Sequence, residues 1–223
     1  MRRASAHTAR RSRLVRLREP EDDAHAIPNL MELETLKDLY VHELKDLYSA
    51  ERQIIKAMPK MVKAASNRQL KSAFSQHLDQ TKRQAKRLED LLASHGHSTR
   101  GPKCQGMEGV LKEGDEMIGE DADEEVRDAG LISAAQRVEH YEIAGYGCAR
   151  TYAELLGDKK GAKVLDTTIK EEGATDQKLT KLARSVINVK AKAAPSKSSR
   201  QRNEREQATV SGAIKDFVKK VTK

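Results

Sequence analysis

The sequence of 223 residues contains little of what several other classes of protein depend on. It has two cysteines, no tryptophan, two phenylalanines and five prolines. Cys104 and Cys148 form no C-x-x-C pair, so neither a disulfide framework nor a thiolate zinc site is expected. No run of 18 or more apolar residues occurs, so no transmembrane helix is expected either. These absences indicate a protein of a reducing compartment, and we expect a cytoplasmic location without a membrane partner.

Excess positive charge is confined to the two ends of the chain. The formal net charge is +8, and it divides into +3 for residues 1–30, −2 for residues 31–187 and +7 for residues 188–223. A basic nucleic-acid-binding face on the folded part is therefore not expected. Electrostatic, nonspecific binding of nucleic acid or another polyanion by the C-terminal tail stays open.

The central part of the chain has the composition of helices, rich in Ala, Leu, Lys, Glu, Gln and Arg. Apolar residues spaced three and four apart predict a helix from residue 33 to about 65, bent near Ile55 by Pro59. A second helix follows Ser66 and Asn67 and ends near Gly96.

A long crossover rich in glycine is expected over residues 96–122, with a short helix at about 107–118. A third helix is predicted over about 123–156. A fourth follows Gly157, which suits a helix end, and Asp158, which suits a helix start. Two antiparallel hairpins joined by a long crossover have the connectivity of a ferritin-like four-helix bundle, so the expected fold is all-α.

The bundle is expected to span residues 31–188, with different segments on either side. Residues 1–30 are interpreted as a disordered basic arm or as an over-extended start, because Met31 directly precedes the first helix. Their composition also resembles a transit peptide. Residues 189–223 are expected to be a disordered basic tail whose last ten residues can form a short amphipathic helix.

Six ionisable residues fall on the apolar faces of the four predicted helices, where burial is costly unless they pair or bind metal. They are Glu51, His77, Glu139, Glu142, Glu172 and Asp176. Residues equally far from the turn of an antiparallel hairpin lie at the same level. Counting from each turn places all six about 22 Å away, at 1.5 Å per residue, near the middle of the bundle.

Carboxylates with an imidazole are the donors that iron and manganese prefer, so the six residues predict one or two ions per chain. Gln80, Gln84, Tyr48 and Tyr146 fall near the same level and are candidates for supporting these ligands. Some of the six residues also suit a purely structural role. Taken alone, Glu51 suits a residue at the flank of its helix that pairs with a lysine, and His77 suits a histidine whose hydrogen bonds are satisfied in the core. Either Glu171 or Glu172 can be the acid that points into the bundle.

Five segments resemble the YciE/YciF family of ferritin-like bacterial stress proteins, also called DUF892, across residues 33–187. They are DLYSAERQ, HLDQTKRQAKRLE, KCQGMEGVLKEGDEMI, VRDAGLISAAQRVEHYEIAGYG and LLGDKKGAKVLDTTIKEEGATDQKL. The resemblance implies a ferritin-like bundle, a homodimer and a dinuclear metal site formed by the same six residues. Relatives tend to have glutamate where this chain has Gln80, which puts full occupancy by two metal ions in question.

Two functions follow as hypotheses. The first is a stress-response protein with a dinuclear iron or manganese site that acts on peroxide or oxygen. The alternative is a non-catalytic stress or nucleoid-associated bundle that binds polyanions through its basic tails. The sequence does not decide between an enzyme and a binding protein.

Overall fold

The structure is a computed structural model and describes residues 33–221. Within that range the chain is helical and contains no strand, which confirms the expected all-α fold. The helices are α1 (Leu36–Ala64), α2 (Arg68–Ser94), α3 (Gln105–Gly119), α4 (Glu124–Leu155), α5 (Lys159–Leu182), a π-helical turn (Ala183–Ile187), α6 (Asn188–Ala193) and α7 (Lys197–Val221). None of the described helices is long and apolar enough to cross a membrane.

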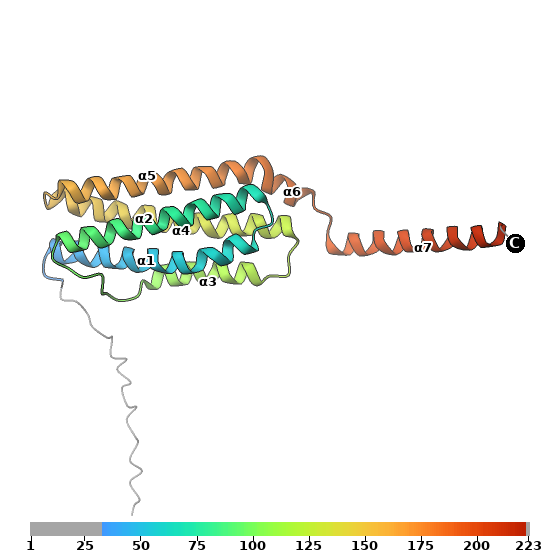
Figure 1. Cartoon of the computed structure of the whole chain (residues 1–223), viewed down its shortest axis with the longest axis horizontal. Coiled ribbons are helices and arrows are strands. Elements are labelled where there is room, and N and C mark those ends of the chain that lie inside the picture. The colour runs from blue at the N-terminus through green and yellow to red at the C-terminus, as the bar shows by residue number, and fades with distance from the viewer. Residues whose placement is uncertain (1–32, 222–223) are drawn as a thin grey trace, which may run out of the picture. The chain divides into compact units, whose positions relative to one another are not determined.

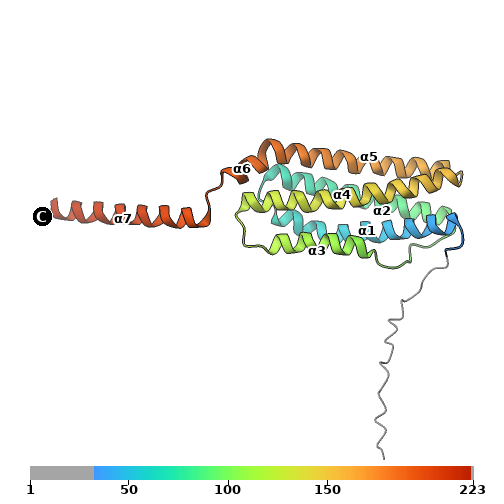
Figure 2. The ribbon, with the colours of Figure 1, turned by 180° about the vertical axis from the view of Figure 1, so that it is seen from behind.

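Helices α1 and α2 form one antiparallel hairpin and α4 and α5 form the other, as the sequence predicted (Figure 1). Helix α3 belongs to the crossover and packs against α1 and α4 (Figure 2). Helix α1 continues through Pro59 to Ala64. Because the two hairpins run antiparallel, the middles of all four long helices lie at one level, and this positions the site.

The turns and helix ends use the expected residues. Asn67 caps α2, where its side-chain oxygen accepts from the backbone amides of Gln69 and Leu70. Asp158 caps α5 by accepting from the Gly161 amide at 2.8 Å. Gly157 has a φ of 75°, the left-handed conformation that favours glycine at a helix end.

A buried carboxylate that was not predicted from the sequence joins the two hairpins. Asp128 of α4 is 2% exposed and accepts hydrogen bonds from the Ser66 amide (2.8 Å), the Ser66 hydroxyl (2.6 Å) and the Asn67 amide (2.8 Å). These contacts fix the α1–α2 turn against the first turns of α4. Hydrogen bonds to a charged group are the stronger kind, so Asp128 is a stabilising residue.

Two apolar clusters fill the bundle, one towards each end. The first apolar cluster surrounds the α1–α2 turn and includes Ile54, Met58, Leu70, Phe74, Leu131 and Leu179. The second apolar cluster surrounds the α4–α5 turn and includes Tyr40, Leu44, Leu47, Leu88, Tyr146 and Leu165. Buried polar residues separate the two along every long helix.

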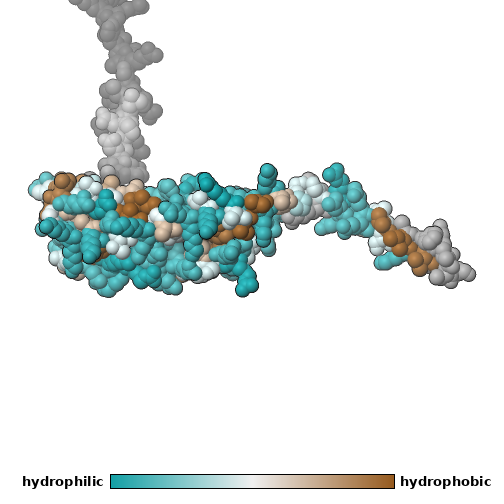
Figure 3. Space-filling view, turned by 90° about the horizontal axis from the view of Figure 1, so that it is seen from above, coloured by the Kyte–Doolittle hydropathy of each residue, from teal (hydrophilic) through white to brown (hydrophobic). Residues whose placement is uncertain are grey.

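The C-terminal part differs from the expected disordered tail. Residues 197–221 form the 25-residue helix α7, which is longer than the short terminal helix considered from the sequence. Val210, Ile214 and Val218 recur every four residues along it and are each more than half exposed. They form an apolar stripe on this helix (Figure 3). The predictions for residues 1–30 lie outside the described residues.

Candidate metal centre

Four side chains meet between the two apolar clusters. His77 comes from α2, Glu139 and Glu142 come from α4, and Glu172 comes from α5. One potential ligand atom from each lies within 4.8 Å of those of the other three, and all four residues are buried. Glu139 and Glu142 are three residues apart, so both point from one helix face into the same space.

These buried ligand atoms lack the partners that would offset the cost of burial. Both oxygens of Glu139 and Glu142, Oε2 of Glu172 and both ring nitrogens of His77 accept or donate no hydrogen bond within residues 33–221. His77 Nε2 and Glu139 Oε1 lie 3.2 Å apart but are not aligned as a hydrogen bond. Such unpaired buried atoms are rare in proteins and call for a missing partner.

Burial strongly shifts the protonation of this group. It raises the pKa of Glu139 and of Glu142 well above the usual range, and neighbouring carboxylates raise both further. Burial also raises the pKa of Glu172. It lowers the pKa of His77 to about 4, so the imidazole is neutral at pH 7 and has a free lone pair. A bound cation would stabilise the ionised carboxylates and leave the imidazole neutral.

Glu51 of α1 lies beside the four residues without belonging to their tightest group. Its side chain is fully buried and accepts a hydrogen bond from the hydroxyl of Tyr146, while its Oε2 has no partner. It also interacts with Glu142, whose pKa its negative charge raises. Glu51 therefore has one buried oxygen without a hydrogen-bond partner, beside a carboxylate of the cluster.

Asp176 is not brought into the group of four. Its carboxylate accepts a hydrogen bond from Gln136 at 2.8 Å and lies 3.3 Å from the exposed ring of His140. It lies one helical turn beyond Glu172 and about 40° further around the axis, because residues four apart on a helix do not align fully. Asp176 thus lines the polar edge of the site.

The four residues expected to support the metal ligands differ in what they contact. Gln84 donates to Glu172 and, at 3.2 Å, to Glu171, whereas Gln80 donates to Thr175 at 3.4 Å. Tyr146 holds Glu51. Tyr48 is half-buried and packs against the second apolar cluster.

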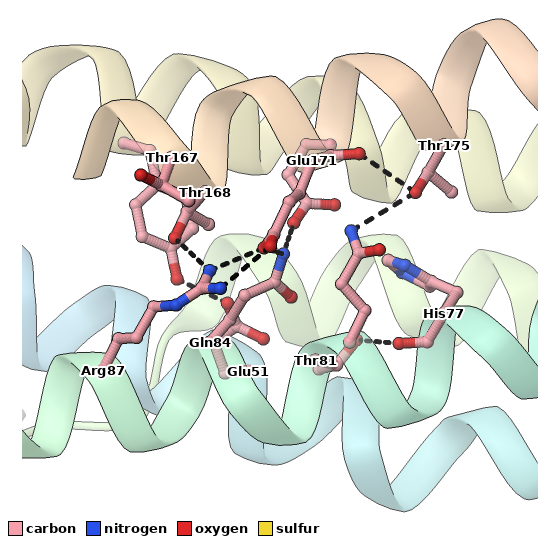
Figure 4. A network of polar contacts seen from close by, with 12 residues as sticks. Glu51, His77, Thr81, Gln84, Arg87, Thr167, Thr168, Glu171 and Thr175 are labelled. Carbon is pink, nitrogen blue, oxygen red and sulfur yellow. Dashed lines mark hydrogen bonds and ion pairs between the residues drawn. The ribbon is translucent and has the colours of Figure 1, made fainter. Parts of the chain in front are cut away.

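The choice left open between Glu171 and Glu172 is decided by their surroundings. Glu172 is fully buried in the cluster, whereas Glu171 forms a two-pronged ion pair with Arg87, at 2.6 and 2.8 Å (Figure 4). Arg87 also lies 3.4 Å from Thr168. Arg87 was not predicted from the sequence, although an arginine about one turn after Gln84 was a usable signal.

The residues present fit a metal ion. Three carboxylates and a neutral imidazole, with Glu51 beside them, are hard oxygen and nitrogen donors of the kind that iron and manganese prefer. One ligand atom from each of the four residues lies within 4.8 Å of those of the other three, close enough for one ion to reach them. The fold and this cluster define a helical-bundle protein with a buried carboxylate–histidine centre.

Comparison with known proteins agrees with this class. Residues 35–192 match the family described as a domain of unknown function, DUF892, and the chain belongs to that family. It is 46% identical to Protein YciF of Escherichia coli K12 over 162 residues, 72% of this chain and 98% of that protein.

Solved structures are similar too. The crystal structure of the E. coli stress protein YciF matches with a TM-score of 0.68, covering 70% of this chain and 99% of that one. YcfI from Rhodopseudomonas palustris, 41% identical, matches with a TM-score of 0.66 over 68% of this chain and 97% of that one. The resemblance inferred from the five sequence segments is thereby confirmed.

Proposed function

We propose that this chain is a stress-response protein that binds iron or manganese, as one or two ions, between Glu139, Glu142, Glu172 and His77. The observation that carries the proposal is the set of unpaired buried ligand atoms on these four residues. Selection for a stable bundle alone would favour apolar residues here, because a buried group of like charges destabilises the fold. A cation removes that cost.

The surrounding residues would orient the ligands. Gln84 holds one oxygen of Glu172, and Tyr146 holds one oxygen of Glu51, so each carboxylate keeps its other oxygen free. Such outer hydrogen bonds fix ligand orientation and tune a metal site. The ion pair of Arg87 with Glu171 links α2 to α5 beside the cluster.

The bound ions would supply one-electron chemistry with dioxygen or peroxide, a reaction class consistent with a relative named as a stress protein. The protein's contribution is to hold the ligands and exclude water. Two apolar clusters on either side of the centre limit solvent access to it.

Metal analysis tests the proposal. Protein purified without chelator, and again after reconstitution with Fe(II) or Mn(II), is expected to contain one to two ions per chain. The matched control is Glu142→Gln, which keeps the shape of the side chain and removes its charge. Fewer than about 0.2 ions per chain after reconstitution, far below one complete site, would contradict it.

A second candidate function is polyanion binding by the tail. Residues 188–223 carry a net charge of +7, and the structure describes helix α7 in this segment with basic residues along it. Binding would be electrostatic and would weaken steeply with salt. Loss of DNA retention at low salt after truncation at Ser196 supports this function, and unchanged retention removes it.

A further inference from the structure

A small apolar cavity lies against the metal cluster and is not used by the proposed binding of ions. It is enclosed by α1, α3 and α4 and has a volume of about 30 Å³. Its apolar wall includes Ile54, Met58, Val110, Gly114, Ala134 and Val138. Its inner end is formed by His77 and Glu139, two of the four clustered residues.

The outer end of the cavity reaches the surface of the bundle. Asp115 lines it there, with a side chain that is 48% exposed and paired with Lys60 at 2.9 Å. Between Asp115 and the inner end every lining residue is apolar or glycine. The cavity therefore joins the solvent side of α3 to the cluster through an apolar passage.

The size and lining of this cavity select what can occupy it. A single water molecule needs about 10–15 Å³ of such space, so the cavity holds a molecule of about two heavy atoms. An ion or a strongly hydrogen-bonding molecule would lose its water partners and find none along the wall, and burial of an unpaired polar group is unfavourable. An apolar diatomic molecule has no such cost.

The opposite side of the cluster has the reverse character. There Gln80 meets Thr175, and Asp176 meets Gln136 and the exposed His140. Oxygen and nitrogen donors in contact with solvent suit the passage of a hydrated cation. The centre thus has one polar approach, between α2, α4 and α5, and one apolar approach, between α1, α3 and α4.

We propose that the apolar cavity is the route and resting place of dioxygen at this centre, with α3 as its outer wall. The inference rests on the proposed metal site and names the substrate class of that site. Dioxygen would arrive beside His77 and Glu139 without crossing the polar approach. Hydrogen peroxide, which needs hydrogen bonds, would use the polar approach instead.

Xenon binding tests the cavity without any metal, because xenon occupies apolar cavities of proteins. Crystals of metal-free protein under xenon pressure are expected to show one anomalous peak between Met58, Val110 and Ala134. Ala134→Leu fills the space and should abolish the peak. Ala144→Leu is the matched control, since it makes the same substitution at an exposed position of α4 that does not line the cavity.

Stopped-flow oxidation of Fe(II)-loaded protein tests the route. Ala134→Leu should slow oxidation by dioxygen by about tenfold, equivalent to about 1.4 kcal/mol, and leave oxidation by hydrogen peroxide and the Fe(II) stoichiometry unchanged. Gly114→Leu, which fills the same space from the peripheral helix α3, repeats the test if Ala134→Leu does not fold.

The failures are distinguishable. No xenon peak in the unmodified protein, an unchanged rate with dioxygen in both filled variants, or equal slowing with dioxygen and peroxide overturns the cavity's role while metal binding stands. Absence of Fe(II) uptake, measured separately, would instead remove the proposed function and this inference with it.

Discussion

The carboxylate layer, formed by Glu51, His77, Glu139, Glu142 and Glu172, is as buried as the apolar clusters on either side of it but differs from them in polarity and charge. In the clusters, side chains such as Leu44 and Leu131 are fully buried in apolar surroundings, which stabilises the fold. In the layer, equally buried groups each have at least one ligand atom without a hydrogen-bond partner, and the carboxylates repel one another. The clusters account for stability, and a bound cation would account for the layer.

The largest expected effect comes from removing one charge of the layer. Glu142→Gln should weaken Fe(II) or Mn(II) binding by more than about 100-fold, since even a supporting contact is worth 10–100-fold. It should raise the melting temperature of the metal-free protein, because the repulsion with Glu51 and Glu139 is relieved. Calorimetric titration and thermal melts measure the two effects. The control, Glu116→Gln at an exposed position of α3, should change neither.

A substitution in the first apolar cluster should lower the stability of the fold and leave metal binding unchanged. Leu131→Ala removes a fully buried side chain and should lower the free energy of unfolding by about 3 kcal/mol, within the range for buried leucines. Metal stoichiometry should stay unchanged. Leu155→Ala, on the same helix but 72% exposed, should change unfolding by less than about 0.5 kcal/mol. Urea denaturation compares them, and metal loss in Leu131→Ala would break the separation between cluster and layer.

Much of this separation was predictable from the sequence. Apolar residues three and four apart predicted the four long helices, and ionisable residues on those faces predicted the layer. Depth counted from the turns was sufficient because the helices of each hairpin run antiparallel. Of the six residues expected in the layer, five lie in it, and Asp176 lies at its polar edge.

The remaining features depend on packing that spacing along one helix does not specify. Asp176 is turned to Gln136 by the contact of α5 with α4. The cavity depends on how α3 rests on α1 and α4, and on small residues such as Gly114 and Ala134 meeting there. The extent of α7 was missed because its sequence has too few apolar residues for a helix packed in a core.

The comparison is sharper between two buried carboxylates, Asp128 with hydrogen-bond partners and Glu142 without them. Asp128 has three hydrogen-bond partners, so Asp128→Ala should lower the free energy of unfolding by about 2 kcal/mol, in contrast with the stabilisation expected for Glu142→Gln. Thermal or urea unfolding of the two metal-free variants provides the test. Equal destabilisation by both would show that Glu142 is also paired in the folded protein.

The smallest expected effect is the change in the melting temperature of the metal-free protein with pH. In metal-free protein the pKa values of Glu139 and Glu142 are higher in the folded than in the unfolded state, where they are about 4.5. Stability is therefore lost as the pH rises from about 4.5 towards the folded pKa values. His77 acts oppositely, since its folded pKa of about 4 means that stability is lost as pH falls below about 6.5. The carboxylates outnumber the imidazole, so metal-free protein should melt higher at pH 6 than at pH 8.

Metal binding reverses this dependence, because protons compete with the ion for the carboxylates. The gain in melting temperature on adding Mn(II) should therefore shrink steadily from pH 8 to pH 5.5. Differential scanning calorimetry at four pH values measures the gain. A gain independent of pH would place the ion on groups other than the layer.

Anomalous diffraction at the iron or manganese absorption edge tests the central claim most directly. Crystals of reconstituted protein are expected to show one or two peaks within coordinating distance of Glu139, Glu142, Glu172 and His77, and none in Glu142→Gln. Ordered carboxylates that share protons with one another, with no anomalous peak among them, would contradict the assignment of the layer as a metal centre.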